Sequence, residues 1–422
     1  MKKFAFLTSE FYPMADANGV CVKNAADELI KRGCKVTVIC EGKGKNERAG
    51  KIDVIHIKDT LYKRLNAYTE RKNNIFTRFM RKAFLCIRRV VLGLISPFTF
   101  PNVSPMRSFS EYRVLEKLYK QEPFDCVIGT FRPYENIEAV NKFKIKHPEV
   151  KSEIIYLDIL DAKNPFGMLF DKYFRAMVEK SEKRTFDIND LILIPKSAEE
   201  KYSGAEYKFA GAKIRFFDFP LFTAKTKKTG ERKTGDTLNI VYAGSADGFN
   251  RNAEYFLEIA QKLRERGESI MVSFYGSFSD RKIMQKYKDT DFVRFCGKIL
   301  PNEVEKVLLD ADFLLNLSNR VTYTMIPSKI FQMFSTCQPI INMVANEKDA
   351  SLGYFAKYPA AVNIPEYEKN LETDVQKISE FMENMNDFDV DFEKVRNTFS
   401  DNTPETFCDI LTKGAYNKQH EL

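Results

Sequence analysis

The sequence predicts an α/β protein with two doubly wound, mostly parallel β-sheets, one in each half of the chain. Short apolar runs rich in β-branched residues alternate with amphipathic stretches along most of the sequence, which is the pattern of repeated βαβ units. The length of 422 residues also exceeds the roughly 250–300 residues at which single cores stop growing. We therefore expect two Rossmann-like domains.

The N-terminal half begins with a βαβ unit. We expect a strand at 4–8, a loop at 10–20, a helix at 21–32 and a second buried strand at 35–40. Gly33 stands just after the helix, where glycine commonly ends helices. Further strands are expected at 126–129, 153–158, 191–195 and 213–217. Together these strands form the first sheet.

A polar, basic stretch separates the two halves. The segment AKTKKTGERKTGDT has no apolar periodicity, which is typical of an exposed connection. We place the N-terminal domain at 1–222, a linker at 223–237, the C-terminal domain at 238–395 and a last helix, which can pack back on the N-terminal domain, at 396–422. The second domain should contain strands at 238–243, 269–275, 293–296, 313–317 and 339–343, and helices at 253–266, 302–309 and 328–335.

The composition narrows the possible functions. The formal net charge of +8 is mild for this length and the basic residues form no recognisable nucleic-acid module, so phosphate-bearing ligands or an anionic membrane surface are favoured over nucleic acid. The eight cysteines include no C-x-x-C pair and there are only three histidines, which argues against a zinc site and for a reducing, cytoplasmic location. No apolar run reaches the roughly 18 residues of a spanning helix, and the apolar start is too short for a secretory signal.

Several motifs occur in a recognisable order. In the second half these are VYAGSADGFNRN, FYGSF, VRFCGKILPNEVEKVLLDADFLLNLS and IPSKIFQMFSTCQPII. With the N-terminal SEFYPMADANGVCVKNAADELIKRGCKVTVI and with EKRTFDINDLILIPKSAEEKY, they resemble the family 4 glycosyltransferases, especially bacterial members that build surface polysaccharides. The resemblance implies the GT-B fold, in which two Rossmann-like domains face a central cleft, and use of a nucleotide-sugar donor without a metal.

The start of the helix expected at 328 is the first candidate for binding the donor diphosphate. Pro327 suits the first helical turn, while Ser328 and Lys329 add a hydroxyl and an ammonium to the free backbone N–H groups. These donors can hold a diphosphate without a metal. The alternative is an ordinary helix start with a solvated lysine.

Other strand ends of the C-terminal domain supply further donor-binding candidates. The Gly244–Ser245 turn permits close backbone approach and precedes Arg251, a second cation. Gly276 ends another strand, and the resemblance implies that the nucleobase lies near Lys298 and Ile299. Plain turn glycines and a surface arginine remain the competing interpretations.

The sequence departs from the family at its best-known signature, two glutamates eight positions apart. Thr324 and Gln332 occupy the matching positions. Gln332 can still exchange hydrogen bonds with ribose hydroxyls, but both negative charges are lost. This leaves open an alternative, a catalytically impaired GT-B protein that binds nucleotide or partners another transferase. A sugar-nucleotide epimerase is less favoured, because that chemistry needs carboxylates and histidines that this region lacks.

In the N-terminal domain, Gly19 would let the backbone approach the sugar or acceptor. Asp158 and Asp161 follow a predicted strand and are candidates for activating the acceptor; a structural role is the alternative. The DFDVD stretch at 387–391 has the spacing of metal-using transferases, but it lies in an acidic connection, and we expect no metal there.

The densest charge asymmetry lies in a basic amphipathic segment at 63–96, where Glu70 is the only acid between Lys63 and Arg89. On a helix, Phe76, Met80, Ala83, Phe84, Ile87, Val91 and Leu94 share one arc, opposite Arg78, Lys82 and Arg89. Such a helix suits an anionic membrane surface beside a polyprenyl-linked acceptor. The alternative is an insertion helix packed on its own domain with a solvated basic face.

Together, the residues and the family resemblance predict a retaining, metal-independent glycosyltransferase with no cofactor. It would move sugar from a nucleotide-sugar donor to a saccharide or polyprenyl-linked acceptor in surface polysaccharide biosynthesis. The expected location is the cytoplasm or the inner face of the cell membrane, and no nucleic-acid partner is expected.

Overall fold

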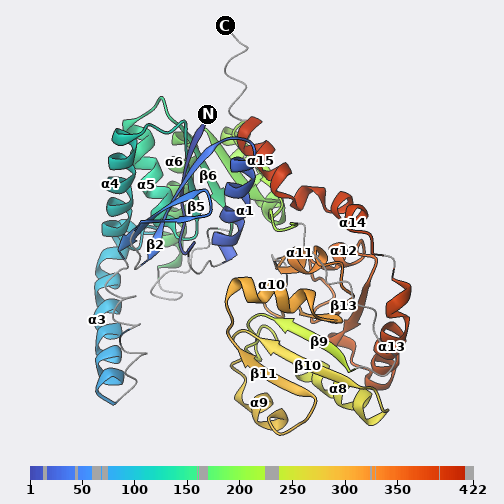
Figure 1. Ribbon diagram of the computed structural model, residues 1–422. Coiled ribbons are helices and arrows are strands. Elements are labelled where there is room, and N and C mark those ends of the chain that lie inside the picture. Colours follow the sequence, from blue (N-terminus) through green and yellow to red (C-terminus); the bar gives the residue numbers. More distant parts are fainter. Residues whose placement is uncertain are drawn as a thin grey trace. The chain divides into compact units, whose positions relative to one another are not determined.

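The computed structural model (Figure 1) describes residues 1–12, 17–42, 46–58, 68, 75–158, 160, 170–223, 237–323, 326–327, 329–388 and 390–413. The start of the basic segment, apart from Tyr68, lies outside these residues, as do the polar connection at 224–236 and the C-terminal tail. The chain divides into two compact units. Unit 1 comprises Met1–Pro220 and the segment that begins at Pro404, and unit 2 comprises Leu221–Thr403.

Unit 1 is built on an eight-stranded sheet in the order β3-β4-β2-β1-β5-β6-β7-β8. Its strands are β1 (Lys3–Leu7), β2 (Lys35–Gly42), β3 (Glu47–Ala49), β4 (Ile52–Lys58), β5 (Cys126–Phe131), β6 (Lys151–Tyr156), β7 (Leu191–Pro195) and β8 (Ile214–Phe217). Every pairing is parallel except the β3–β4 hairpin at one edge. The strand order reverses between β1 and β5, which makes that position the topological switch point.

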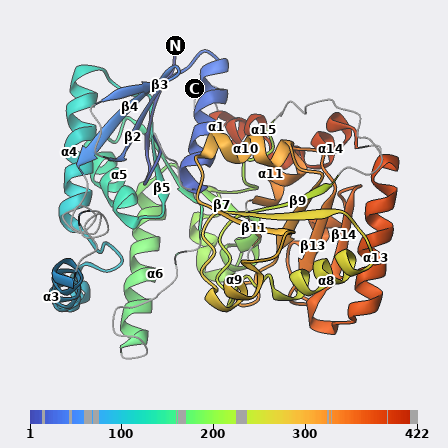
Figure 2. The same ribbon diagram turned by 60° about the horizontal axis from the view of Figure 1, so that its bottom comes forward.

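Helices cover both faces of this sheet, as buried parallel strands require. The helices of unit 1 are α1 (Ala17–Lys31), α3 (Ile75–Thr99), α4 (Pro105–Gln121), α5 (Tyr134–Lys146), α6 (Asp171–Ile188), α7 (Glu199–Tyr202) and α15 (Pro404–Lys413), of which α3 extends away from the sheet (Figure 1). In Figures 1 and 2, α4 and α5 lie on one side of the sheet, and α1 and α15 lie on the other.

The last described helix, α15, packs on the first. Cys408 Sγ donates to Ala25 O (3.4 Å), and Arg32, directly after α1, bridges Glu28 (2.9 Å) and Asp409 (2.7 Å). The Phe407 ring meets the Phe217 ring edge-on, with centroids 5.1 Å apart. Residues beyond unit 2 in the sequence therefore complete the core of unit 1.

Unit 2 is built on a six-stranded, all-parallel sheet in the order β11-β10-β9-β12-β13-β14. Its strands are β9 (Leu238–Ala243), β10 (Ile270–Tyr275), β11 (Val293–Gly297), β12 (Phe313–Leu317), β13 (Ile340–Val344) and β14 (Ala361–Pro365). Counted along the chain this is the 3-2-1-4-5-6 order of the Rossmann fold. Its switch point lies between β9 and β12.

The helices of unit 2 are α8 (Glu254–Glu265), α9 (Arg281–Tyr287), α10 (Pro301–Leu309), α11 (Lys329–Phe334), α12 (Leu352–Phe355), α13 (Leu371–Glu383) and α14 (Phe392–Thr398). On α8, Phe256, Ile259 and Leu263 are buried while the opposite face is exposed, the usual pattern of a helix on a core. Asp391 accepts a hydrogen bond from Lys394 N (2.7 Å) and caps α14. One aspartate of the DFDVD stretch therefore has a structural role.

The predicted fold class is confirmed, since both halves are α/β and mostly parallel. The expected strands at 191–195, 238–243 and 313–317 coincide with β7, β9 and β12. The β3–β4 hairpin and the edge strand β14 were not predicted, because edge strands carry a weaker apolar signal than central ones. No helix among the described residues is both long and apolar enough to cross a membrane.

We expect Phe407→Ala to destabilise unit 1 by about 3–4 kcal/mol, because it removes a buried ring and leaves a cavity. Urea unfolding followed by circular dichroism measures the loss. Phe98→Ala serves as the control, since that ring is 83% exposed and its removal should change stability by less than about 0.5 kcal/mol. Equal effects of the two substitutions would contradict the packing of α15 in this core.

Candidate functional site

The switch point of the unit 2 sheet is the position where a Rossmann domain binds its ligand, outside the carboxyl ends of the strands. Two loops meet there, one after β9 and one after β12. Arg251 Nε donates to Asn319 Oδ1 (2.9 Å), and Asn250 Nδ2 donates to the same oxygen (3.2 Å). Arg320 N donates to Asn250 O (2.8 Å). These bonds fix the guanidinium of Arg251 beside the switch point.

The loop after β9 is held by a carboxylate. Asp247 Oδ1 accepts hydrogen bonds from the backbone N–H groups of Phe249 (2.9 Å), Asn250 (2.7 Å) and Arg251 (3.1 Å). Burial opposes ionisation of Asp247, but these N–H groups outweigh it and lower the pKa of the carboxyl. Asp247 therefore fixes the backbone that presents Arg251.

Lys329 brings a second cation to the same place. It is the first residue of α11, and its Nζ donates to Ala243 O, at the end of β9 (3.1 Å). Burial, assisted by the charge of Arg251, lowers the pKa of Lys329 to about 8. Among the residues that the structure describes, no carboxylate forms an ion pair with Lys329 or Arg251. Two cations in a partly buried site, with the nearby Asp247 carboxylate bound to backbone N–H groups instead of to either cation, are an arrangement that favours binding of an anion.

Two glycines permit this close packing. Gly244 N donates to Tyr275 O, and Gly276 N donates to Gly297 O, each at 2.7 Å. A Cβ atom at Gly244 would collide with Lys329 Nζ, and one at Gly276, where φ is +119°, would collide with the carbonyl oxygen of Gly244. Any side chain at Gly244 would thus displace the ammonium, and the positive φ at Gly276 favours glycine.

The remaining predicted donor-binding residues lie at varying distances from this cluster. Ser245 is part of it, since its Oγ lies 3.4 Å from Arg251 Nη1 and its carbonyl accepts from Tyr242 Oη (2.7 Å). Gln332 is half-buried one turn into α11. Pro327 and Ile299 are half-buried and Lys298 is exposed, and none of the three forms a hydrogen bond with Arg251 or Lys329 among the described residues. Thr324 and Ser328 lie outside the described residues.

Sequence reasoning missed three residues that shape the site: Asn319, Asp247 and Tyr242. Asn319 stands two residues after β12, and Asp247 stands four after β9, so position after a strand was the available signal. Tyr242 lies within β9, the expected strand at 238–243, and no signal in the sequence singled it out. Only the fold shows that its hydroxyl reaches the loop at Ser245.

In unit 1, the predicted Asp158 stands two residues after β6, the strand next to β5 in the sheet. Its carboxylate forms an ion pair with Arg132 Nε (2.9 Å), and Arg132 O accepts from Asn18 Nδ2 (3.3 Å). Arg132 directly follows β5. Asp161 lies outside the described residues.

The expected loop at Gly19 was wrong, because α1 begins at Ala17 and buries Gly19 in its first turn. The helix starts before the first regular apolar position, Cys21, so the apolar pattern placed its start too late. Gly19 therefore lies in a helix beside Asn18 rather than in an open turn.

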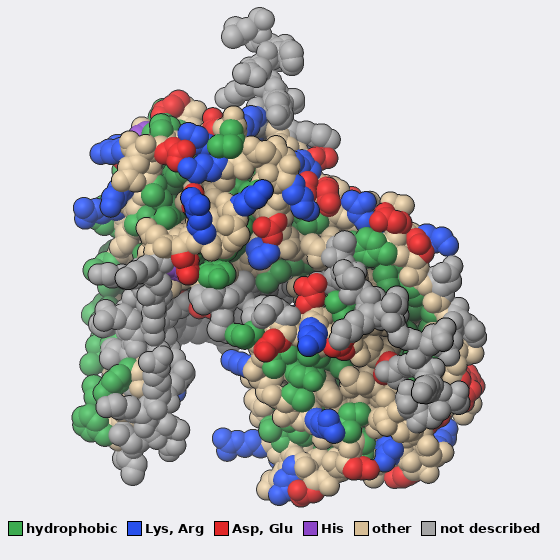
Figure 3. All heavy atoms as spheres, viewed as in Figure 1, with side chains coloured by type: hydrophobic (Ala, Val, Ile, Leu, Met, Phe, Trp, Pro, Cys, Tyr) green, Lys and Arg blue, Asp and Glu red, His purple; other side chains and the backbone are tan. Residues whose placement is uncertain are grey.

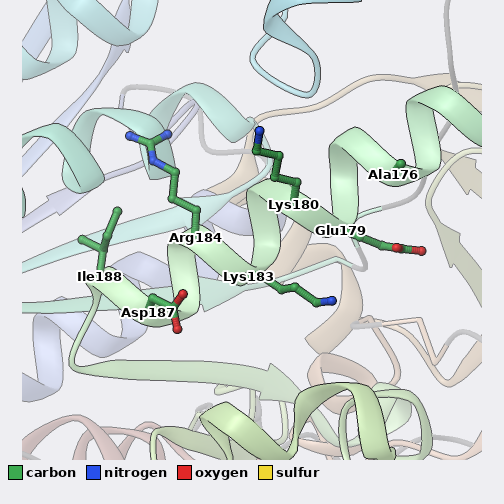
Figure 4. A pocket seen from close by; sticks show the side chains of 7 residues that line it. All are labelled: Ala176, Glu179, Lys180, Lys183, Arg184, Asp187 and Ile188. Carbon is green, nitrogen blue, oxygen red and sulfur yellow. The ribbon is translucent and has the colours of Figure 1, made fainter.

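A shallow depression on unit 1 does not resemble a ligand site (Figure 4). Its lining side chains all come from α6, namely Ala176, Glu179, Lys180, Lys183, Arg184, Asp187 and Ile188. Charges of both signs line it, and Arg184 forms an ion pair with Glu138 (2.9 Å).

The described residues contain no group of three or more histidine, cysteine, aspartate or glutamate side chains placed to hold a metal ion.

We expect Lys329→Met to stabilise the ligand-free protein by about 1–3 kcal/mol at pH 7, since it removes a desolvated charge. The native pKa of about 8 lies below the ordinary value of 10.5. The loss of stability that the charge of Lys329 causes in the wild type is therefore complete below pH 8 and is relieved as the pH rises toward 10.5. Thermal unfolding between pH 7 and 10.5 should show the advantage of the variant shrinking. Lys262→Met, at an exposed position of α8, is the control and should show no such trend.

Comparisons with known proteins give the fold but no close relative. No family model matches the sequence, and no curated protein matches it. Among solved structures, sucrose-phosphate synthase from Thermosynechococcus elongatus is 11% identical with a TM-score of 0.56, covering 99% of both chains. WaaG, a glycosyltransferase involved in lipopolysaccharide biosynthesis, is 13% identical with a TM-score of 0.54, covering 97% of this chain and 99% of its own. Anabaena HepE, in complex with UDP and glucose, is 9% identical with a TM-score of 0.53, covering both chains fully. The chain therefore has the GT-B fold of these glycosyltransferases.

Proposed function

We propose that the protein is a glycosyltransferase of the family 4 type whose nucleotide-sugar donor binds at the switch point of unit 2. The observation that carries this proposal is the pair of cations, Arg251 and Lys329, held together without a carboxylate partner among the described residues. A nucleoside diphosphate supplies the missing negative charge. HepE, whose fold is similar, is complexed with UDP and glucose.

The cations would act on the leaving group. As the sugar departs, negative charge grows on the diphosphate, and donors already fixed in a partly dry site stabilise that charge without reorganising. Asn319 and Ala243 O hold Arg251 and Lys329 in place, so the site is pre-formed. We propose that this replaces a metal ion and that no cofactor is needed.

The other predicted residues complete the proposal. Gln332 would bind the ribose, and Lys298 with Ile299 would border the base. The acceptor would be a saccharide or a lipid-linked sugar. Asp158, ion-paired with Arg132, would position the hydroxyl of the acceptor. The leaving phosphate would take the proton of that hydroxyl in a retaining reaction. The similar fold of WaaG, involved in lipopolysaccharide biosynthesis, supports a role in surface polysaccharide assembly.

A second candidate is a protein that binds the nucleotide without turnover. The observation in its favour is the replacement of both family glutamates by Thr324 and Gln332. In this second candidate the diphosphate site is the same, but the negative charge beside the donor sugar is missing. The two candidates therefore differ in turnover alone.

Calorimetry with UDP, GDP and ADP in the presence of EDTA tests the proposal. We expect one diphosphate to bind, and Arg251→Ala or Lys329→Met to weaken it about 10- to 100-fold, the usual worth of a charge-assisted hydrogen bond. Lys262→Met is the control and should bind as the wild type does. Failure of all three nucleotides to bind, or a strict requirement for a divalent ion, would refute the site.

Incubating the protein with the matching nucleotide-sugar then separates the candidates. Hydrolysis or transfer identifies a transferase, and binding without turnover identifies the second candidate. Conversion of the donor into an isomer with no acceptor present would identify an epimerase instead.

The diphosphate affinity should also depend on pH. Below pH 8 Lys329 is already protonated in the free protein, so affinity should be flat there. Above its pKa of about 8, binding must take up a proton, and affinity should fall by up to tenfold per pH unit. Calorimetry between pH 7 and 9.5 measures this fall. In Lys329→Met the residual affinity should show no such step, and an unchanged step there would assign the titration to another group.

A further inference from the structure

Helix α3 exposes the apolar side of its amphipathic pattern. Its exposed large apolar side chains include Phe76, Phe79, Met80, Ile87, Val90, Val91, Leu94 and Phe98. At about 100° per residue these positions fall within an arc of about 120°. On the other side, Thr77 and Ser96 are buried. A surface helix of a globular protein does the opposite, as α8 does.

The exposed apolar surface on this arc is large. Leu94 is 70% exposed and Phe98 83%, and hydrophobic side chains gather along the outer edge of α3 in Figure 3. At its C-terminal end the helix is fixed to α6, since Tyr173 Oη donates to Pro97 O (2.6 Å) and Phe174 packs against Phe100. Contiguous apolar patches of this kind mark interaction surfaces.

The charges of α3 indicate the kind of partner that its exposed surface binds. Between Ile75 and Thr99 the sequence has five basic residues and no acidic one. Arg81, Lys82 and Arg89 are exposed on the arc opposite the apolar one. A basic face opposite an apolar face is the pattern of helices that lie in the interface of an anionic bilayer.

We propose that α3 is a membrane-surface docking helix that lies in the plane of an anionic bilayer with its apolar arc among the acyl chains. The helix carries too many charges to cross a bilayer, and none of the described helices qualifies as a span. A second copy of the chain fits less well, because pairing two α3 helices would bring ten positive charges together, whereas anionic lipids neutralise them. This inference goes beyond the proposed function and does not depend on which sugar is transferred.

Vesicle flotation with the full chain tests the proposal. The protein should float with vesicles of phosphatidylcholine and phosphatidylglycerol and should stay unbound with phosphatidylcholine alone. Raising the salt to roughly 1 M, where the Debye length falls to about 3 Å, should release it. Ile87→Glu should lower the bound fraction about tenfold, because it places a charge in the apolar arc. Arg81→Glu with Lys82→Glu should lower it similarly.

The matched control is Ile145→Glu, because Ile145 on α5 is 60% exposed, as Ile87 is, and should bind like the wild type. Circular dichroism and nucleotide affinity, unchanged in Ile87→Glu, would show that the fold and the donor site are intact. Absence of flotation, equal binding to uncharged vesicles, or an equal loss in Ile145→Glu would overturn the proposal. So would a stable dimer that Ile87→Glu dissociates while no vesicle binds.

Discussion

The placement of Lys329 beside Arg251 is the constraint around which unit 2 is arranged. Two like charges in a partly buried site repel each other and lose hydration, which lowers the pKa of Lys329 to about 8. The surrounding fold holds them there nonetheless. Ala243 O fixes one cation, Asn319 fixes the other, and the absence of a side chain at Gly244 leaves room for the ammonium. Stability sacrificed in this way is typical of sites that await a ligand of opposite charge.

The fold could be predicted because its central strands are buried on both faces. Strand β7 is a continuous apolar run and β12 is interrupted only by Asn316, and the bounds of both agree with the prediction. Elements at the periphery of the fold were predicted less well. The β3–β4 hairpin is short and lies at the edge of its sheet, and α1 extends beyond its apolar pattern to include Gly19. The local apolar pattern of the sequence predicts an element well where its burial is complete and poorly where the element is half exposed.

The candidate site was predictable in part. Arg251 and Lys329 stand 78 positions apart in the sequence. The sequence singled out Arg251 after a strand and Lys329 at a helix start, and the structure brings both to the end of β9. Asn319 and Tyr242 escaped prediction, because neither residue type signals a site and their roles depend on how neighbouring strands lie. The ion pair of Asp158 with Arg132 likewise joins two strand ends of unit 1. The sequence names groups capable of chemistry, whereas the sheet order decides which of them meet.

Two places in this molecule depart from what folding alone would favour, and they do so in opposite ways. At Lys329 the fold buries charge, and along α3 it exposes apolar side chains around Ile87 and Leu94. Each departure costs free energy in water, and each would be relieved by a different environment, an anion in one case and a lipid surface in the other. The two proposals, a charged donor at Lys329 and a membrane surface at α3, each account for one of these features. Because they lie on separate elements, a substitution can remove either feature while leaving the other intact.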